Sequence, residues 1–378
     1  MSAFDLISQR IRERGPITVA EYMSMALYHP ECGYYAQAVR RTGRNGDFIT
    51  SVDIGPLFGT LLSRQLAEMW LRMRESEDEA FDVVEAGASN GQLARDVLDA
   101  AAANDPAFYR AIRLHLVEAS PAARATHPQV LGPHAVKLAS SSARLPDVVH
   151  GAIYANELFD ALPVHAVVMS DEGLRECYVD LHGDRLVERV GPLSNAALAR
   201  YFEALDVTLE PGWRAEVNLA ALAWMTRASL SLHRGFMLLV DYGHEARELY
   251  SATHATGTLT TFTRHVSERT RGGGTPPWLV DPGGRDVTSH IDLTSIRRTA
   301  EALGCTTLGL LDQTYFLLAL GLAAEVEGAP STAATRRRLM LKTLMLPGGL
   351  GSTHKVMIFS KDLEQPVLRG LSGTLRLT

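Results

Sequence analysis

Two glycines and a later glutamate give the most specific chemical signal in this sequence. Gly87 and Gly91 lie in DVVEAGASNGQLARDVL, directly after a strand-like run and at the opening of a helical pattern. Glycine permits a positive φ and a close approach of the backbone to a ligand. The next apolar run ends at Glu118, whose carboxylate can accept hydrogen bonds from both ribose hydroxyls of a nucleoside. A purely structural βα turn with a solvated Glu118 is the alternative that these residues leave open.

The residues between the two glycines favour one class of ligand. A dinucleotide site prefers the pattern G-x-G-x-x-G, in which a pyrophosphate lies on the helix N-terminus. Here Ala88, Ser89 and Asn90 fill the turn. The turn therefore favours a nucleoside with an amino-acid tail over a dinucleotide.

A group of acceptor side chains follows the third apolar strand. Asn156, Glu157 and Asp160 lie within five residues, and Asp241 ends the later run LLVDYG. If the nucleoside ligand carries a methyl group on a sulfonium, the rate of transfer of that group depends largely on how the nucleophile is positioned. Carboxylates can clamp a guanidinium bidentately and localise its charge on the other nitrogens. If the methyl acceptor were a hydroxyl or carboxyl group, the site would instead need a histidine as general base, or only groups that position the acceptor.

These polar residues also have structural interpretations. Glu157 and Asp160 could cap a following helix, and Asp241 could orient a loop by accepting backbone hydrogen bonds. A structural or surface role is also the simpler interpretation of three polar residues near predicted turns, which are His244, His290 and Asp292. Because they match no metal-binding spacing, the sequence predicts no metal site.

Composition sets broad limits on the function. The net charge of −6 argues against non-specific binding of nucleic acid. The widely spaced cysteines, Cys32, Cys177 and Cys305, suggest neither a zinc site nor a disulfide framework, which fits a reducing compartment. No run of about 18 apolar residues predicts membrane insertion. The N-terminal MSAFDLISQRIRERG resembles neither a signal peptide nor a transit peptide, so we expect a cytoplasmic protein.

Alternating strands and helices must position these residues. We expect strands at 81–85, 112–120, 151–160, 235–243 and 354–361, a β-meander at 164–191, and helices at 3–14, 19–29, 57–73, 91–104, 194–206, 215–233, 292–303 and 315–326. This order predicts an α/β fold with a mainly parallel sheet and ligands at the carboxyl ends of its strands. The apolar helix at 315–326 is expected in the core rather than at a dimer face.

The same residues resemble a known family over most of the chain. GPITVAEYMSMALYHPECGYYA, GDFITSVDIGPLFG, VVEAGASNGQL, LVEASP, YANELFDALPVH, LVDYGH, TLTTFTRH, DVTSHIDLTSI and QTYFLLALG are similar to segments of the MidA-like family, methyltransferases associated with assembly of respiratory complex I. The resemblance implies a Rossmann-like class I methyltransferase core with a helical N-terminal extension and an inserted β-meander and helical region. It also implies S-adenosylmethionine as the cofactor.

The resemblance divides the chain into four segments. Residues 1–75 are expected to pack on the core as N-terminal helices and a GDF loop. The first half of the core would span 76–163, the insertion 164–234, and the second half of the core, with late insertions, 235–378.

The resemblance also gives roles to particular residues. It implies that the donor is held by Gly87, Ala88, Ser89, Gly91 and Glu118, and that Asp47, Thr50 and Ser51 belong to a lid over cofactor and substrate. Asn156, Glu157 and Asp160 would face the methyl acceptor. The turn reads GASNGQL where the family has strings close to GPGRGTL, and TSVDIGP replaces TSPEISP-like strings. These departures bear on the substrate more than on the cofactor.

The function expected from this resemblance is protein arginine N-methylation of a respiratory complex I-type subunit. Two alternatives stay open, namely methylation of a small molecule or peptide in biosynthesis, and a non-catalytic assembly chaperone. The expected partners are a protein substrate or a small acceptor, without nucleic acid or membrane insertion, and a homodimer is left open.

Overall fold

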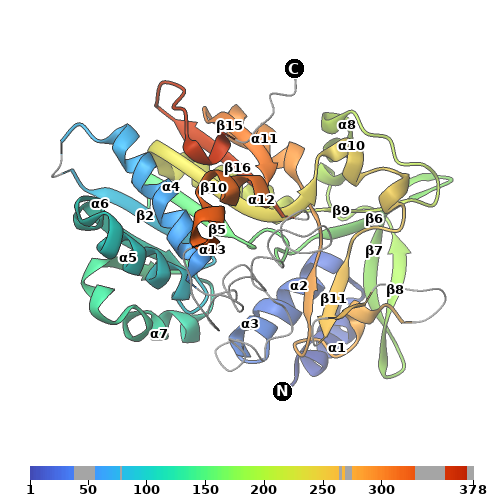
Figure 1. The fold of residues 1–378 in the computed structure, drawn as a ribbon. Helices are drawn as coiled ribbons and strands as arrows, with labels where there is room; N and C mark the ends of the chain where they lie inside the picture. The colour runs from blue at the N-terminus through green and yellow to red at the C-terminus, as the bar shows by residue number, and fades with distance from the viewer. Residues whose placement is uncertain (38–55, 77–78, 264–265, 269–274, 328–353, 373–378) are drawn as a thin grey trace. The chain divides into compact units, whose positions relative to one another are not determined.

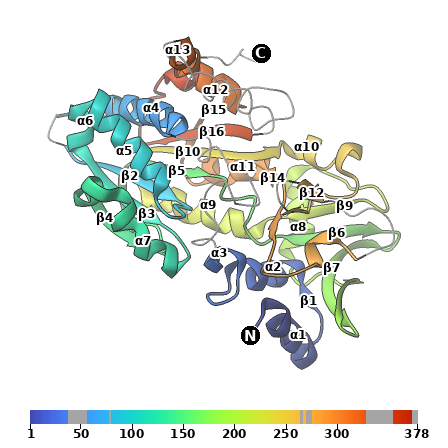
Figure 2. The ribbon, with the colours of Figure 1, turned by 60° about the horizontal axis from the view of Figure 1, so that its bottom comes forward.

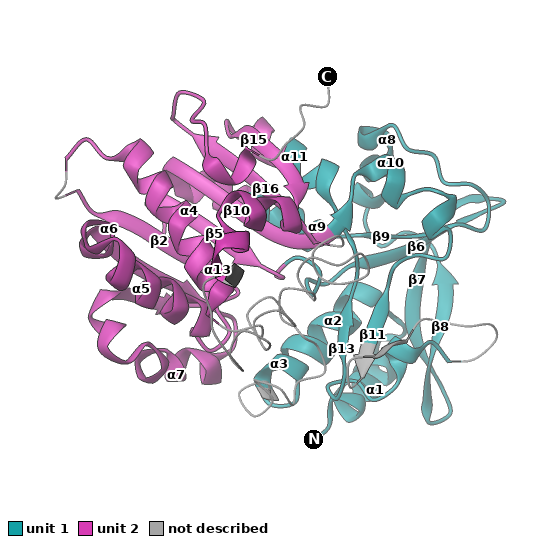
Figure 3. Ribbon diagram, in the orientation of Figure 1, with its two compact units in different colours: residues 1–48, 159–225, 243–298 teal, residues 49–158, 226–242, 299–378 magenta. Residues whose placement is uncertain are grey.

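The chain forms two compact units whose segments alternate along the sequence. The computed structural model describes residues 1–37, 56–76, 79–263, 266–268, 275–327 and 354–372. Unit 1 comprises 1–48, 159–225 and 243–298, and unit 2 comprises 49–158, 226–242 and 299–378 (Figure 3). The four-segment division expected from the sequence stays a prediction.

Unit 2 is built on the large sheet. Among the described residues its strands have the order β15-β16-β10-β5-β2-β3-β4. Their bounds are β2 (Phe81–Ala86), β3 (Ile112–Val117), β4 (Leu138–Ser142), β5 (Val149–Asn156), β10 (Leu232–His244), β15 (Thr306–Asp312) and β16 (His354–Lys361). Pairing is parallel from β10 through β4, whereas β16 is antiparallel to both of its neighbours. This sheet confirms the predicted α/β class.

Helices cover the sheet of unit 2 and pack against it to form the hydrophobic core of that unit. They are α4 (Leu57–Met73), α5 (Gln92–Asn104), α6 (Pro106–Ala111), α7 (Pro121–Leu131), α12 (Gln313–Ala319) and α13 (Leu322–Glu327), with short 3-10 turns η2 (Gly132–Lys137) and η5 (Arg369–Leu371). Figures 1 and 2 show α4 and α5 side by side. Every residue of β2 is buried, as expected for a parallel strand covered on both faces.

Gly151 and Gly235 leave no room for a side chain where β5 and β10 pair. They are paired in the β5–β10 register, and a Cβ on Gly235 would lie 1.9 Å from the carbonyl oxygen of Gly151. Gly235→Ala is therefore expected to lower the free energy of unfolding by about 3 kcal/mol or more, measured by chemical denaturation. Gly183→Ala, at φ +63° with nothing within 4 Å of its Cβ, should cost only about 1 kcal/mol. Equal losses in the two variants would contradict the steric argument.

Unit 1 contains the N-terminal helices and two smaller sheets. One sheet is formed by β1 (Ile17–Thr18), β6 (His165–Ser170), β7 (Gly173–His182), β8 (Arg185–Gly191) and β9 (Arg214–Val217), and the other by β11 (Thr260–Thr263), β12 (Val266–Glu268) and β13 (Asp286–Thr288). The remaining elements are α1 (Ala3–Arg14), α2 (Val19–Tyr28), α3 (Tyr34–Gln37), α8 (Ala197–Leu205), α10 (Ala246–Leu249), η3 (Ala252–His254), η4 (Pro277–Leu279) and β14 (Ile291–Asp292). Ser2 and Asp5 form a capping box that fixes the start of α1.

Two expected helices differ from the structure, and one further strand lies where no element was expected. The helix expected at 215–233 is α9 (Leu219–Ser231), because its first residues form β9 instead. The helix expected at 315–326 is broken, since Gly321 at φ +98° ends α12 before α13 begins. We did not expect β15, which is only partly buried and has an irregular register between Thr307 and Gly309. The expected helix at 292–303 is α11 (Leu293–Ala302).

The late apolar segment lies in the core, as expected. Phe316 and Leu317 are fully buried in the hydrophobic cluster of unit 2. Within the described part of the chain, no helix has both the length and the apolarity needed to cross a membrane.

Candidate functional site

The glycine turn after β2 has the backbone geometry that the sequence predicts. Gly87 and Gly91 have φ values of 72° and 86°, and Ser89 has a positive φ of 47°. The N–H groups of Gly87 and Ala88 both donate to the carbonyl of Val117, at 2.9 and 3.1 Å. The turn is thereby attached to the end of β3, and Gly91 begins α5 without a side-chain cap. The turn thus presents exposed backbone at the carboxyl edge of the sheet.

Glu118 binds the turn directly. One oxygen of its carboxylate accepts the N–H of Ser89 and the other accepts the N–H of Ser120, each at 2.8 Å. Burial raises the pKa of Glu118, although the two N–H groups favour the ionised form. A carboxylate oxygen can accept more than one hydrogen bond, so each retains capacity for a further donor such as a hydroxyl. Glu118 is therefore held against the glycine turn, and the alternative of a solvated side chain does not apply.

Glu157 lies in a strained backbone conformation where β5 ends. Its φ is 51°, which is uncommon for a residue other than glycine, asparagine or aspartate. Its N–H donates to the carbonyl of Val240 on the neighbouring strand β10, at 2.8 Å. Strain of this kind costs of order 1–3 kcal/mol and is concentrated at functional sites. The observation makes Glu157 a candidate for chemistry.

Two side chains lie against the Glu157 carboxylate. Asn156 Nδ2 donates to Oε1 at 3.3 Å, and His354 Nε2 lies 3.6 Å from the same oxygen. The side chains of Glu157 and His354 are 7% and 2% exposed. Asn156 Oδ1 is buried and has no hydrogen-bond partner among the described residues. This edge therefore offers acceptor oxygens to a ligand that carries several N–H groups.

Asp241 uses its carboxylate to order the backbone. It is 2% exposed, Oδ2 accepts the N–H of Leu158 at 3.1 Å, and Oδ1 accepts the N–H of Tyr242 at 2.8 Å. The Leu158 bond fixes the segment that follows Glu157. This geometry matches the loop-orienting alternative considered for Asp241.

The remaining predicted site residues are either bonded within unit 1 or outside the described residues. Asp160 belongs to unit 1, is buried, and accepts the N–H of Ser289 through its backbone carbonyl at 2.9 Å. The helix-capping alternative for Glu157 and Asp160 is wrong, because the chain continues from them into strand β6. The three predicted lid residues, Asp47, Thr50 and Ser51, lie outside the described residues. Asp292 is a buried structural acceptor, bonded to the Tyr201 hydroxyl at 2.8 Å.

Sequence reasoning missed His354. It begins β16 and pairs in register with Tyr242. Because β16 is antiparallel, its first residue lies at the edge where the parallel strands end. A histidine at the start of an apolar final strand was therefore the available signal.

A second missed residue is Glu85, a buried acid in the middle of the sheet. It is 4% exposed, accepts the Tyr154 hydroxyl at 3.0 Å, and has its pKa raised to about 8 by burial. The folded state therefore binds a proton that the unfolded state releases above a pH of about 4.5. The stabilisation from this proton is complete below that pH and is lost as the pH rises towards 8, by about 1.4 kcal/mol per unit.

Glu85→Gln is expected to remove this component of the pH dependence, because the amide does not titrate. Denaturant unfolding at a series of pH values between 5 and 8 measures the change. The exposed Glu364→Gln should leave the slope unaltered. Identical slopes for Glu85→Gln and the unaltered chain would contradict the assignment.

Comparison with known proteins identifies the family. Residues 61–311 match a family described as S-adenosyl-L-methionine-dependent methyltransferases. The mitochondrial protein arginine methyltransferase NDUFAF7 of Mus musculus is 30% identical over 345 residues, covering 84% of this chain and 74% of the relative. Its Drosophila melanogaster homolog is 28% identical, covering 92% and 82%.

A solved structure agrees with this similarity. A Burkholderia thailandensis protein with bound S-adenosyl-homocysteine has a TM-score of 0.86 and 27% sequence identity, covering 98% of this chain and 94% of that protein. The resemblance to the MidA-like family is thereby confirmed, together with the expected methyltransferase fold.

These relatives correct the expected location. Their names place them in mitochondria, which contradicts the cytoplasmic location that we expected. That expectation rested on the first residues of the chain, whereas the similarity extends over most of its length. Since the family match spans more than half of its length, this chain belongs to that family of S-adenosyl-L-methionine-dependent methyltransferases, with S-adenosylmethionine as its cofactor.

Proposed function

We propose that this chain methylates an arginine side chain of a protein. The observation that carries the proposal is Glu157, a buried carboxylate in a strained conformation at the end of β5, with the acceptor Asn156 Oδ1 beside it. A guanidinium presents five N–H donors in a planar fork, which suits a carboxylate with a neighbouring amide oxygen. The names of relatives at about 30% identity support the same acceptor.

The donor end of the site is assigned to unit 2. The residues that would hold the donor are Gly87, Ala88, Ser89, Gly91 and Glu118. Glu118 fits the ribose because its carboxylate is ordered by two backbone N–H groups and can still accept hydroxyls. When bound, S-adenosylmethionine supplies a methyl group on a positively charged sulfur. Asp47, Thr50 and Ser51 stay proposed lid residues.

The acceptor end works by orienting and polarising a nitrogen. A guanidinium has a pKa above 12, so its nitrogens are poor nucleophiles. Glu157 would accept two N–H groups and draw the positive charge towards the nitrogens that it binds, which leaves the remaining nitrogen richer in electrons. Asn156 would accept a further N–H. Asp241 and His354 are positioning residues, since Asp241 orders the backbone of Leu158, next to Glu157, and His354 lies against the Glu157 side chain. Asp160 stays a proposed second carboxylate.

Transfer of a labelled methyl group tests the proposal. The purified chain and labelled S-adenosylmethionine are added to lysate from a host that lacks the gene, and precipitated protein is counted apart from the soluble small molecules. Label in a protein, recovered as methylarginine after acid hydrolysis, is the expected result and would identify the acceptor, for which a respiratory-complex subunit is our prediction.

The other outcomes of that experiment would overturn the proposal. Label confined to the soluble fraction would indicate a biosynthetic methyltransferase. Label in protein on another residue type would exclude arginine. Donor binding without any transfer would indicate an assembly chaperone.

A further inference from the structure

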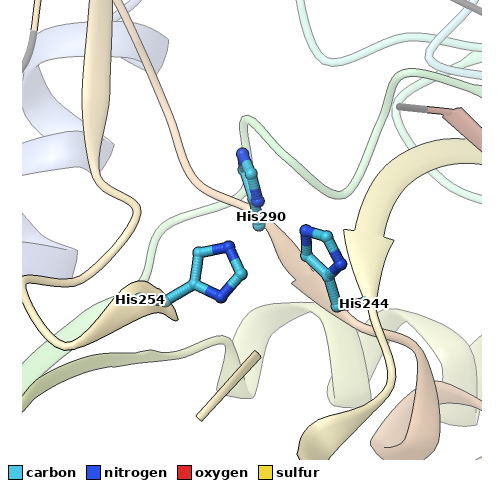
Figure 4. A group of neighbouring side chains, drawn as sticks. All are labelled: His244, His254 and His290. Atoms are coloured by element: carbon cyan, nitrogen blue, oxygen red, sulfur yellow. The ribbon is translucent and has the colours of Figure 1, made fainter. Parts of the chain in front are cut away.

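Three histidines at the ends of different elements of unit 1 meet in the fold. His244 ends β10, His254 ends η3, and His290 lies just before β14. A ring nitrogen of each lies within 4.8 Å of the others, and the ring centroids are 4.7, 5.3 and 5.8 Å apart. Figure 4 shows each ring turning a nitrogen towards the space that the three enclose. We propose that this cluster binds a zinc ion through three imidazoles, with a fourth position left to water.

Glu248 lies against two of the three rings and accepts a hydrogen bond from one of them, His254. His254 Nδ1 lies 3.1 Å from the backbone carbonyl of Glu248, which can only accept, so Nδ1 carries the proton and Nε2 bears the lone pair when the ring is neutral. His244 Nδ1 lies 3.0 Å from Glu248 Oε1. Histidines that bind metals donate their other ring N–H to a carboxylate or carbonyl in this way, which fixes the ring and its tautomer. The bond from His254 to the Glu248 carbonyl is of this kind.

The backbone holds the three histidines before any ion binds. His254 accepts the N–H of Gly257 through its carbonyl at 2.8 Å. The N–H of His290 donates to Thr258 Oγ1 at 3.0 Å. His244 belongs to the parallel β10–β14 ladder. The ligands therefore do not need to be gathered from mobile segments, which lowers the entropy cost of binding.

Zinc suits this set of donors. Imidazole nitrogens are good ligands for zinc, copper and nickel, and three histidines with an open fourth position are a known zinc geometry. Zinc–nitrogen distances of 2.0–2.1 Å place ligand nitrogens about 3.4 Å apart in a tetrahedron. The rings thus need only small rotations to close on an ion. All three are partly exposed, so an ion can reach them.

Zinc titration of the untagged full chain tests the site. After removal of metal by a chelator, competition with a chromophoric chelator should show one zinc per chain. His254→Gln should weaken the affinity by about 100-fold or more, since it removes a ligand. Glu248→Gln should weaken it by about tenfold, because the carbonyl that orients His254 stays in place. The exposed His182→Gln, in the same unit, should leave it unchanged.

Three results would overturn the proposal. They are binding below one zinc per chain, equal weakening by His182→Gln and His254→Gln, and an X-ray absorption spectrum of the zinc-loaded unaltered chain with fewer than three imidazole ligands. The spectrum needs no variant, so it decides the question even where a substitution prevents folding. None of these readouts depends on methyl transfer.

Discussion

Glu157→Gln is expected to lower kcat for methyl transfer by two to four orders of magnitude, with donor affinity unchanged. The amide keeps the size of the side chain and its strained backbone, but it loses the charge that would hold a guanidinium. The donor contacts assigned to Glu118 and the glycine turn are not altered. Steady-state transfer to the identified protein acceptor measures kcat, and calorimetric titration with S-adenosyl-homocysteine measures donor affinity.

Two further variants separate chemistry from folding at this position. Glu157→Gly should be more stable than the unaltered chain by about 1 kcal/mol, because glycine adopts φ 51° without strain, and yet be as inactive as Glu157→Gln. Glu172→Gln, whose side chain is 85% exposed, should keep full activity. If Glu157→Gln kept more than a tenth of the activity, the carboxylate would have no part in binding a cationic acceptor.

Glu118→Gln is expected to raise the Kd for the donor by about 100-fold. Hydrogen bonds to a charged group contribute about 1.5–3 kcal/mol, and the ribose would lose a charged acceptor. An amide also turns its NH2 group towards the N–H of Ser89 or Ser120, which disturbs the glycine turn. Calorimetric titration with S-adenosyl-homocysteine gives the Kd, and kcat at saturating donor should change much less.

A matched control keeps that result interpretable. The exposed Asp147→Asn, in the same unit, should leave the Kd unchanged. Thermal unfolding of Glu118→Gln reports any loss of the turn itself. An unchanged Kd in a folded Glu118→Gln would show that Glu118 only closes the turn.

Local patterns made the donor side of the site predictable. A buried run, two glycines and an amphipathic helix lie within 24 residues of one another, so the local sequence pattern alone predicts β2, the turn and α5. The position of Glu118 near the turn can also be predicted, because β3 is parallel to β2 and ends at the same edge of the sheet. Such inferences need only the chain direction and the rule that parallel strands end together.

Long-range pairing made the rest unpredictable. His354 reaches Glu157 only because β16 inserts antiparallel beside β10. His254 and His290 join His244 through the β10–β14 ladder and the turn at Gly257, and no spacing along the chain encodes that meeting. Asp160 is three residues from Glu157 in the sequence but belongs to unit 1.

The buried acid Glu85 also has a consequence for calorimetry. With a pKa of about 8, it carries a proton at neutral pH, so the folded chain is less negative by nearly one charge than its formal −6. Unfolding at pH 7 exposes this acid and releases close to one proton into the buffer. The apparent enthalpy of unfolding will therefore include the heat with which the buffer takes up that proton. The proton from Glu85 should contribute close to the difference between the two ionisation heats when scans in phosphate and in Tris are compared.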